Sequence, residues 1–99
     1  MNVAIIGCGA IARKRHAPAL LSYKGACFHA VCDPVKANAD DMARNYQVKA
    51  YYDIDTLLCE KDLDAVILCT PERFHKEHVI KALRAGKHVL CEKPLAVNA

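Results

Sequence analysis

A glycine pair near the start of the chain has the spacing of a phosphate-binding turn. The run Gly7-Cys8-Gly9-Ala10-Ile11-Ala12 matches the pattern G-x-G-x-x-A. In this pattern the first glycine permits a tight turn, the second lets a diphosphate approach the backbone, and the small last residue keeps helix and strand close. A helix that starts here would offer unpaired N–H groups and a partial positive charge to an anion. The run predicts a dinucleotide site if a strand precedes it and a helix follows it.

An acidic residue follows at the distance that such a site needs. Asp33 ends an apolar run 21 residues after Ala12, where a carboxylate can accept hydrogen bonds from the ribose hydroxyls of adenosine. A carboxylate at this point repels the 2′-phosphate of NADP, so NAD is the expected cofactor and NADP is less favoured. Arg13 and Lys36 would partly offset that repulsion. A helix cap in front of Pro34 is an alternative role for Asp33, and both roles are compatible.

Apolar runs and amphipathic segments alternate along the chain, which predicts the elements that position these residues. The expected strands cover 2–6, 26–32, 49–52, 64–69 and 88–91, and the expected helices cover 10–22, 35–45, 53–58 and 72–85. Pro34 is expected at a first helical position, Asp53 or Asp55 as a cap, and Gly86 as a helix stop. In the last helix, Phe74, Val79, Ala82 and Leu83 are expected to form the apolar side.

This alternation predicts an α/β fold with right-handed crossovers. The expected architecture is a Rossmann-like, doubly wound parallel sheet in the strand order 3-2-1-4-5. The ligand crevice is then expected at the carboxyl ends of the first and fourth strands, where the strand order reverses.

The overall composition restricts the class of protein. The chain has 99 residues, is 54% hydrophobic and carries a formal net charge of +3, which predicts one globular domain. No apolar run reaches the about 18–20 residues of a membrane span, and no secretory signal is visible. The only basic cluster, Arg13-Lys14-Arg15, lacks the aromatic residues and second basic stripe of a nucleic-acid site. We therefore expect neither a membrane nor a nucleic-acid partner.

The six cysteines and the paired histidines have a structural interpretation. The cysteines form no C-x-x-C pair and lie mostly in or beside apolar runs, which is typical of reduced, buried thiols in a cytoplasmic protein. His75 and His78 lie on one predicted helix, but the order H-K-E-H is not that of a metal-binding helix motif. No metal site is therefore expected. His29 and His88 are expected to be strand-surface or hydrogen-bonded core residues.

Two runs in the second half of the chain resemble the motifs of one oxidoreductase family. The first, Ala85-Gly86-Lys87-His88-Val89-Leu90-Cys91-Glu92-Lys93-Pro94-Leu95-Ala96, resembles the signature A-G-K-H-V-x-x-E-K-P-x-A of the glucose–fructose oxidoreductase / inositol dehydrogenase (Gfo/Idh/MocA) family. The second, Thr70-Pro71-Glu72-Arg73-Phe74-His75, resembles the family segment T-P-N-x-x-H, with Glu72 where asparagine is usual. The glycine run and Cys32-Asp33-Pro34 also fit, so the resemblance covers essentially the whole chain.

The resemblance implies an NAD(P)-dependent oxidoreductase that acts on a hydroxyl or carbonyl group of a sugar, nucleotide sugar or cyclitol. It places Lys93 near the nicotinamide, where the lysine would orient the substrate hydroxyl or assist its proton transfer. Glu92 would orient Lys93 or contact the cofactor. Thr70 and Pro71 would form the lip of the cofactor crevice, with His75 supporting it. Glu72 in place of asparagine leaves one polar contact open.

The resemblance also implies parts that these 99 residues do not contain. They are the final strand of the dinucleotide fold and an α+β domain that binds substrate and mediates association into a homo-oligomer. We therefore expect residues 1–99 to be an NAD(P)-binding domain, incomplete at its C-terminal end and inactive alone. An alternative is a non-catalytic NAD(P)-binding sensor, which has little need of Lys93. A different Rossmann reductase is a weaker alternative, because the run Glu92-Lys93-Pro94 disfavours it.

Overall fold

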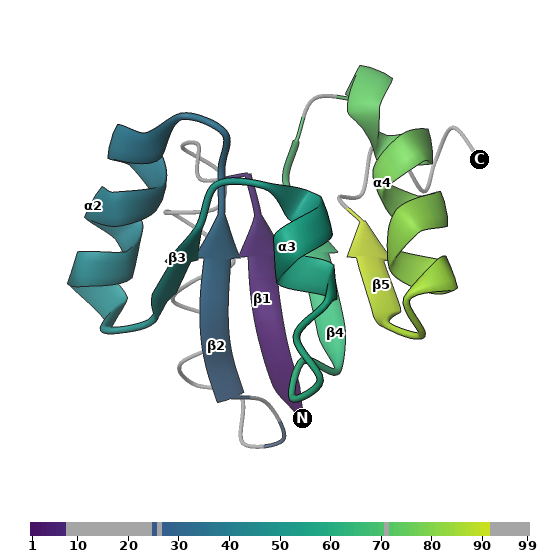
Figure 1. The fold of residues 1–99 in the computed structure, drawn as a ribbon, viewed down its shortest axis with the longest axis horizontal. Coiled ribbons are helices and arrows are strands. Elements are labelled where there is room, and N and C mark those ends of the chain that lie inside the picture. Colours follow the sequence, from purple (N-terminus) through teal and green to yellow (C-terminus); the bar gives the residue numbers. More distant parts are fainter. Residues whose placement is uncertain (8–24, 26, 71, 92–99) are drawn as a thin grey trace.

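One parallel sheet organises the part of the chain that the computed structural model describes, residues 1–7, 25, 27–70 and 72–91. Within these residues the sheet has five strands in the order β3-β2-β1-β4-β5 (Figure 1). The strands are β1 (Asn2–Ile6), β2 (Cys27–Cys32), β3 (Lys49–Tyr51), β4 (Ala65–Leu68) and β5 (His88–Cys91). The predicted α/β class and strand order are confirmed. The expected helix over 10–22 lies outside the described residues.

Both faces of the sheet are covered by helices. Helix α2 (Lys36–Tyr46) packs on one face, and α3 (Ile54–Leu58) and α4 (Glu72–Arg84) pack on the other (Figure 1). Val3 and Ile5 of β1 belong to the core on the α2 side, whereas Ala4 and Ile6 belong to the core on the α3 side. This is why β1 and β4 are continuous apolar runs, as expected for strands buried on both faces.

Strand β2 contains one extra residue relative to β1. Val3 pairs with Phe28 but Ala4 pairs with Ala30, so His29 has no counterpart in β1. Such a bulge leaves one residue outside the regular ladder. The imidazole Nε2 of His29 lies 2.5 Å from Oε1 of Glu60, in the loop after α3. His29 is thus a hydrogen-bonded, half-buried residue, as expected.

Glu60 is the centre of a polar network on the α3 side of the sheet. Its carboxylate accepts a hydrogen bond from the Tyr51 hydroxyl, and Lys49 Nζ lies 3.3 Å from Oε1. Lys87 Nζ donates to the Glu60 and Leu63 carbonyls at 2.8 and 2.7 Å. The network joins β2, β3, the loop after α3 and the turn before β5. It fixes a loop that contains no regular secondary structure.

The same contacts shift the titration of two groups. The hydrogen bonds from Tyr51 and His29 lower the pKa of Glu60 from 4.5 to about 2, against the opposing effect of burial. The hydrogen bond to Glu60, burial and the Glu60 charge raise the pKa of Tyr51 from 10.0 to about 12. Ionised Glu60 and neutral Tyr51 are therefore the forms that the fold stabilises.

Several element boundaries differ from the predicted ones. Helix α2 begins at Lys36 with Val35 as N-cap, so Pro34 is not at the first helical position. Val35 is extended, and its N–H donates to Asp33 Oδ1 at 2.8 Å, which holds Pro34 in a turn before the helix. Strand β4 excludes both ends of the expected range, 64 and 69. The exposed Asp64 instead accepts the Asn2 N–H at 2.7 Å through Oδ2.

Helix α4 buries a narrower face than predicted. Val79 and Ala82 contact the core, whereas Phe74 and Leu83 are 38% and 59% exposed. Leu83 follows Ala82 by one residue, and one helical step turns a side chain by about 100° away from its neighbour. Gly86 ends the helix with φ +79°, and the Lys87 N–H donates to the Ala82 carbonyl at 3.0 Å. The expected stop at Gly86 is confirmed.

The expectation of buried cysteines is only partly correct. Cys32 is buried and Cys69 is half-buried, but Cys27 and Cys59 are exposed thiols. Cys27 lies at the amino end of β2, and Cys59 directly follows α3. Each cysteine therefore lies just beyond the buried residues of its element. Cys8 and the Cys91 side chain lie outside the description. None of the helices in the described ranges is long and apolar enough to cross a bilayer.

Replacing Glu60 by glutamine should lower the free energy of unfolding by about 1–2 kcal/mol at neutral pH, because bonds to a charged acceptor become bonds to a neutral one. The Glu60 contribution is present above its unfolded pKa of 4.5 and is lost as the pH falls towards about 2. Urea denaturation at several pH values should therefore show the difference between wild type and variant shrinking with acid. Glu77→Gln, at a pair with 62% exposure of the Glu77 side chain, is the control and should have little effect.

Candidate functional site

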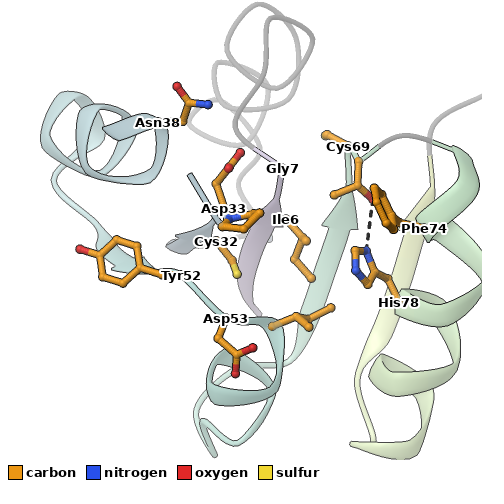
Figure 2. Close-up of a pocket in the computed structure, with 13 residues that line it drawn as sticks. Ile6, Gly7, Cys32, Asp33, Asn38, Tyr52, Asp53, Cys69, Phe74 and His78 are labelled. Carbon is orange, nitrogen blue, oxygen red and sulfur yellow. Dashed lines mark hydrogen bonds between the residues drawn. The ribbon is translucent and has the colours of Figure 1, made fainter. Parts of the chain in front are cut away.

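The carboxyl ends of β1, β2 and β4 surround a cavity of about 630 Å³. This volume is typical of a site for a small molecule or cofactor. The described residues that line it are Ile6, Gly7, Cys32, Asp33, Pro34, Asn38, Tyr52, Asp53, Ile54, Cys69, Thr70, Phe74 and His78. Figure 2 shows Cys32 and Asp33 on one side, Phe74 and His78 on the other, and Ile6 between them. The cavity lies at the reversal of strand order, where the sequence predicts the crevice.

Gly7 forms the point of closest backbone approach in this cavity. It follows β1 with φ +95°, a conformation that disfavours a side chain. A Cβ placed on Gly7 would lie 2.9 Å from the Cys69 carbonyl carbon and 3.0 Å from Thr70 Cγ2. The Gly7 N–H donates to the Cys32 carbonyl at 2.7 Å, and the Cys69 N–H donates to the Ile6 carbonyl at 2.8 Å. The glycine is therefore required by both conformation and space.

Asp33 is held rigidly at the end of β2. Asp33 is 8% exposed. Its N–H donates to the Tyr51 carbonyl at 3.0 Å, and its Oδ1 accepts the Val35 N–H at 2.8 Å. The carboxylate thus holds the turn that precedes α2, and the N-cap of that helix is Val35. The alternative role of Asp33 as a helix cap is wrong in this form, because its bond stabilises a two-residue turn.

The opposite side of the cavity is built from one threonine and the first turns of α4. Thr70 Oγ1 lies 3.2 Å from His78 Nδ1, the contact drawn as the dashed line that ends on His78 in Figure 2. The His78 ring stacks on Phe74 with 6.0 Å between centroids and 19° between planes. The Arg73 guanidinium lies 4.9 Å from the Phe74 centroid. Thr70 is thus linked to a stack of planar groups on the helix.

The structure brings together three of the predicted cofactor-binding residues. Gly7, Asp33 and Thr70 line the same cavity. The remaining predicted residues, Cys8, Gly9, Ala10, Ile11, Ala12, Pro71, Glu92 and Lys93, lie outside the described residues. His75 belongs to α4, but its side chain lies outside the description as well.

Several lining residues have no motif that marks them. Tyr52 lines the cavity, donates from its hydroxyl to Asp40 Oδ1 at 2.5 Å, and has Lys36 Nζ 5.7 Å from its ring centroid. Asp53 caps α3, since its Oδ2 accepts the Thr56 N–H at 3.1 Å, so Asp53 rather than Asp55 is the cap. Phe74 and His78 would be found only by placing α4 against the sheet.

The lining fits a nucleotide cofactor better than a metal ion. The close approach at Gly7 leaves a backbone surface that a side chain would fill, as a diphosphate-binding turn requires. Asp33 supplies an acceptor at the end of the neighbouring strand, and the other lining residues are mostly apolar. Among the described residues, no group of three or more His, Cys, Asp or Glu side chains is placed to hold a metal ion.

Comparison with known proteins assigns the family. Residues 1–99 match the family model described as "Oxidoreductase family, NAD-binding Rossmann fold". The chain belongs to the Gfo/Idh/MocA family. The resemblance of the two sequence motifs to this family is confirmed, and so is the doubly wound parallel fold.

Gfo/Idh/MocA relatives with sugar-directed names match over the whole chain. The chain is 40% identical to the D-glucoside 3-dehydrogenase of Escherichia coli (strain K12) over 99 residues, which are 99% of this chain and 28% of that protein. It is 36% identical to the myo-inositol 2-dehydrogenase of Thermotoga maritima over 99 residues, 99% of this chain and 29% of that protein. The chain thus spans less than a third of the length of these relatives.

A solved structure of the family has the same arrangement of elements. A 3-ketoreductase from Actinomadura kijaniata, in complex with TDP-benzene and NADP, superposes with a TM-score of 0.91 at 36% identity. The match covers 96% of this chain and 30% of that protein. NAD(P) binding is therefore a property of the family. Family membership alone does not decide between NAD and NADP.

Substitution of Gly7 by alanine tests the close approach. Gly7→Ala should lower the free energy of unfolding by about 2–5 kcal/mol, the sum of about 1–2 kcal/mol for the backbone conformation and about 1–3 kcal/mol for overpacking. Gly86→Ala is the matched control, since Gly86 also has positive φ, but a Cβ there meets nothing within 4 Å. It should cost only the conformational part. Equal losses for the two variants in urea denaturation would contradict the close approach at Gly7.

Proposed function

We propose that this chain binds NAD at the Gly7–Asp33–Thr70 cavity as the cofactor-binding part of an oxidoreductase. The reaction is hydride transfer between the nicotinamide and a hydroxyl or carbonyl group of a sugar, nucleotide sugar or cyclitol. The observation that supports this most strongly is the convergence of three strand ends on one cavity. A required glycine, a fixed carboxylate and a threonine each come from a different strand end.

Each predicted cofactor-binding residue has a proposed role that follows from its chemistry. Gly7 lets the diphosphate approach the backbone, together with Cys8, Gly9, Ala10, Ile11 and Ala12 of the same run. Asp33 accepts hydrogen bonds from the adenosine ribose. Thr70 and Pro71 would form the lip of the cofactor crevice with His75 supporting it, and Glu92 would orient Lys93 or contact the cofactor. NAD, when bound, supplies the hydride acceptor or donor, and every other step belongs to the protein.

The sugar-like substrate is supported by the named relatives. A glucoside dehydrogenase and an inositol dehydrogenase are 40% and 36% identical to this chain in sequence. A ketoreductase solved with a nucleotide analogue is 36% identical and has the same arrangement of elements. Because the chain spans less than a third of the length of these proteins, substrate binding and homo-oligomer formation are proposed for the whole protein. We also place the protein in the cytoplasm, where exposed thiols such as Cys27 remain reduced.

Lys93 is the proposed catalytic residue. Its Nζ would orient the reacting hydroxyl and help to move its proton, a role worth about 100-fold or more in rate. In protein that turns over a sugar substrate, Lys93→Ala should therefore lower kcat by about 100-fold or more and leave the Kd for NAD nearly unchanged. Lys61→Ala, at an exposed loop residue, is the matched control. Undiminished turnover in Lys93→Ala would contradict the catalytic role.

The choice of cofactor depends on the charge of Asp33. Calorimetry should show NAD binding at least about tenfold tighter than NADP, because a fixed carboxylate next to a 2′-phosphate costs more than about 1.4 kcal/mol. Asp33→Asn should reduce that preference while its Oδ1 still accepts the Val35 N–H. Asp62→Asn, at an exposed acid in the loop after α3, should keep the wild-type preference. Tenfold tighter binding of NADP than of NAD by the wild type would overturn this argument.

A further inference from the structure

We infer that His78 is a positioning residue of the cofactor site, which acts through Thr70 on the glycine turn at Gly7. The inference rests on the proposed NAD-binding function and extends it to a residue on α4. It follows from the way in which Thr70 is placed between two neighbours. One branch of its side chain contacts the histidine, and the other lies beside the glycine.

The two branches of Thr70 have different chemistry. Oγ1 lies 3.2 Å from His78 Nδ1, whereas Cγ2 lies 3.0 Å from the point that a Cβ on Gly7 would occupy. The methyl group therefore covers the space that the missing side chain leaves open. Because a β-branched residue carries two heavy atoms on Cβ, a rotation of about 120° about χ1 can bring the hydroxyl to the place of the methyl group. The hydrogen bond to His78 decides that the methyl, and not the hydroxyl, faces the glycine turn.

His78 is itself held in place by its helix. Val79, the next residue of α4, and Ala82 pack against the core on the α3 side of the sheet. The imidazole ring is stacked on Phe74, whose other neighbour is the Arg73 guanidinium. The ring is half-buried and lines the cavity opposite Asp33 (Figure 2). The ring therefore links α4 to Thr70, which lies just after β4.

The consequence for the cofactor is specific. With His78 present, an apolar methyl group lies beside Gly7, at the point of the proposed diphosphate approach. Without His78, Thr70 loses its hydrogen-bond partner, and rotation about χ1 can turn its hydroxyl towards Gly7 and move the methyl group away from it. NAD should then bind more weakly, although the fold keeps its packing.

The test is NAD titration by calorimetry of the 99-residue chain and its variants. His78→Leu removes the Thr70 partner and should raise the Kd for NAD by about 3- to 10-fold, the range expected for one lost hydrogen bond. His78→Asn keeps a polar δ atom at the position of Nδ1 and should restore most of the affinity. His88→Leu, at an exposed histidine of β5, is the matched control and should bind as the wild type does.

The second half of the test changes Thr70. Thr70→Val keeps the shape and the methyl group beside Gly7 but has no hydroxyl that could turn towards it, so it should bind NAD nearly as the wild type does. The double variant of His78→Leu with Thr70→Val should also bind nearly as the wild type does, since the loss of His78 acts only through the Thr70 hydroxyl. Thermal unfolding of each variant shows whether the fold is retained. If His78→Leu does not fold, His78→Ala replaces it in the single and double variants.

The outcomes separate this inference from the proposed function. Wild-type affinity in His78→Leu, equal weakening by His78→Asn and His78→Leu, or a double variant as weak as His78→Leu would each overturn the role of His78. Failure of the wild-type chain to bind either NAD or NADP would overturn the proposed function and, with it, the inference. Binding by the wild type, weakening by His78→Leu, and rescue both by His78→Asn and by Thr70→Val in the double variant support both.

Discussion

The site depends on the distance between the backbone after β1 and the end of β4. Gly7 passes so close to the Cys69 carbonyl that no side chain fits between them. The approach is fixed on both sides, by the Gly7 N–H to Cys32 and by the Cys69 N–H to Ile6. These two bonds continue the pairing of β1 with β2 and with β4 beyond the strands themselves. The geometry of the cofactor turn is thus a direct extension of the sheet.

The sequence was sufficient to predict the features that depend on local pattern. The alternation of apolar runs and amphipathic segments predicted the strands and their order, and the reversal of that order located the crevice. The predicted start of α2 was wrong because the Asp33 side chain binds the Val35 N–H and holds Pro34 in a turn before the helix. The preference of proline for a first helical position does not reveal this contact. The exposure of Leu83 was missed because it depends on which side of α4 faces the sheet, and that side includes Ala82.

Contacts between distant segments could not be predicted from the sequence. Glu60 lies in a loop without a motif, yet it binds residues of β2 and β3 and its backbone is held by Lys87. His78 is three residues from the histidine of the family motif, and only the packing of α4 brings it to Thr70. In both cases the partner is chosen by tertiary structure. The residue types alone, a glutamate and a histidine, have many alternative roles.

The extra residue in β2 has a consequence for how sequence spacing is interpreted. After the bulge at His29, Ile6 pairs with Cys32, so the next pair along the two strands is Gly7 and Asp33. Without the bulge, Cys32 would lie opposite Gly7, and the carboxylate would be shifted by one residue to the other face of the sheet. The number of residues between the glycine run and Asp33 therefore includes the extra residue of the bulge. Regular pairing of β2 with β1, without the bulge, would preserve the motif's letters and lose its geometry.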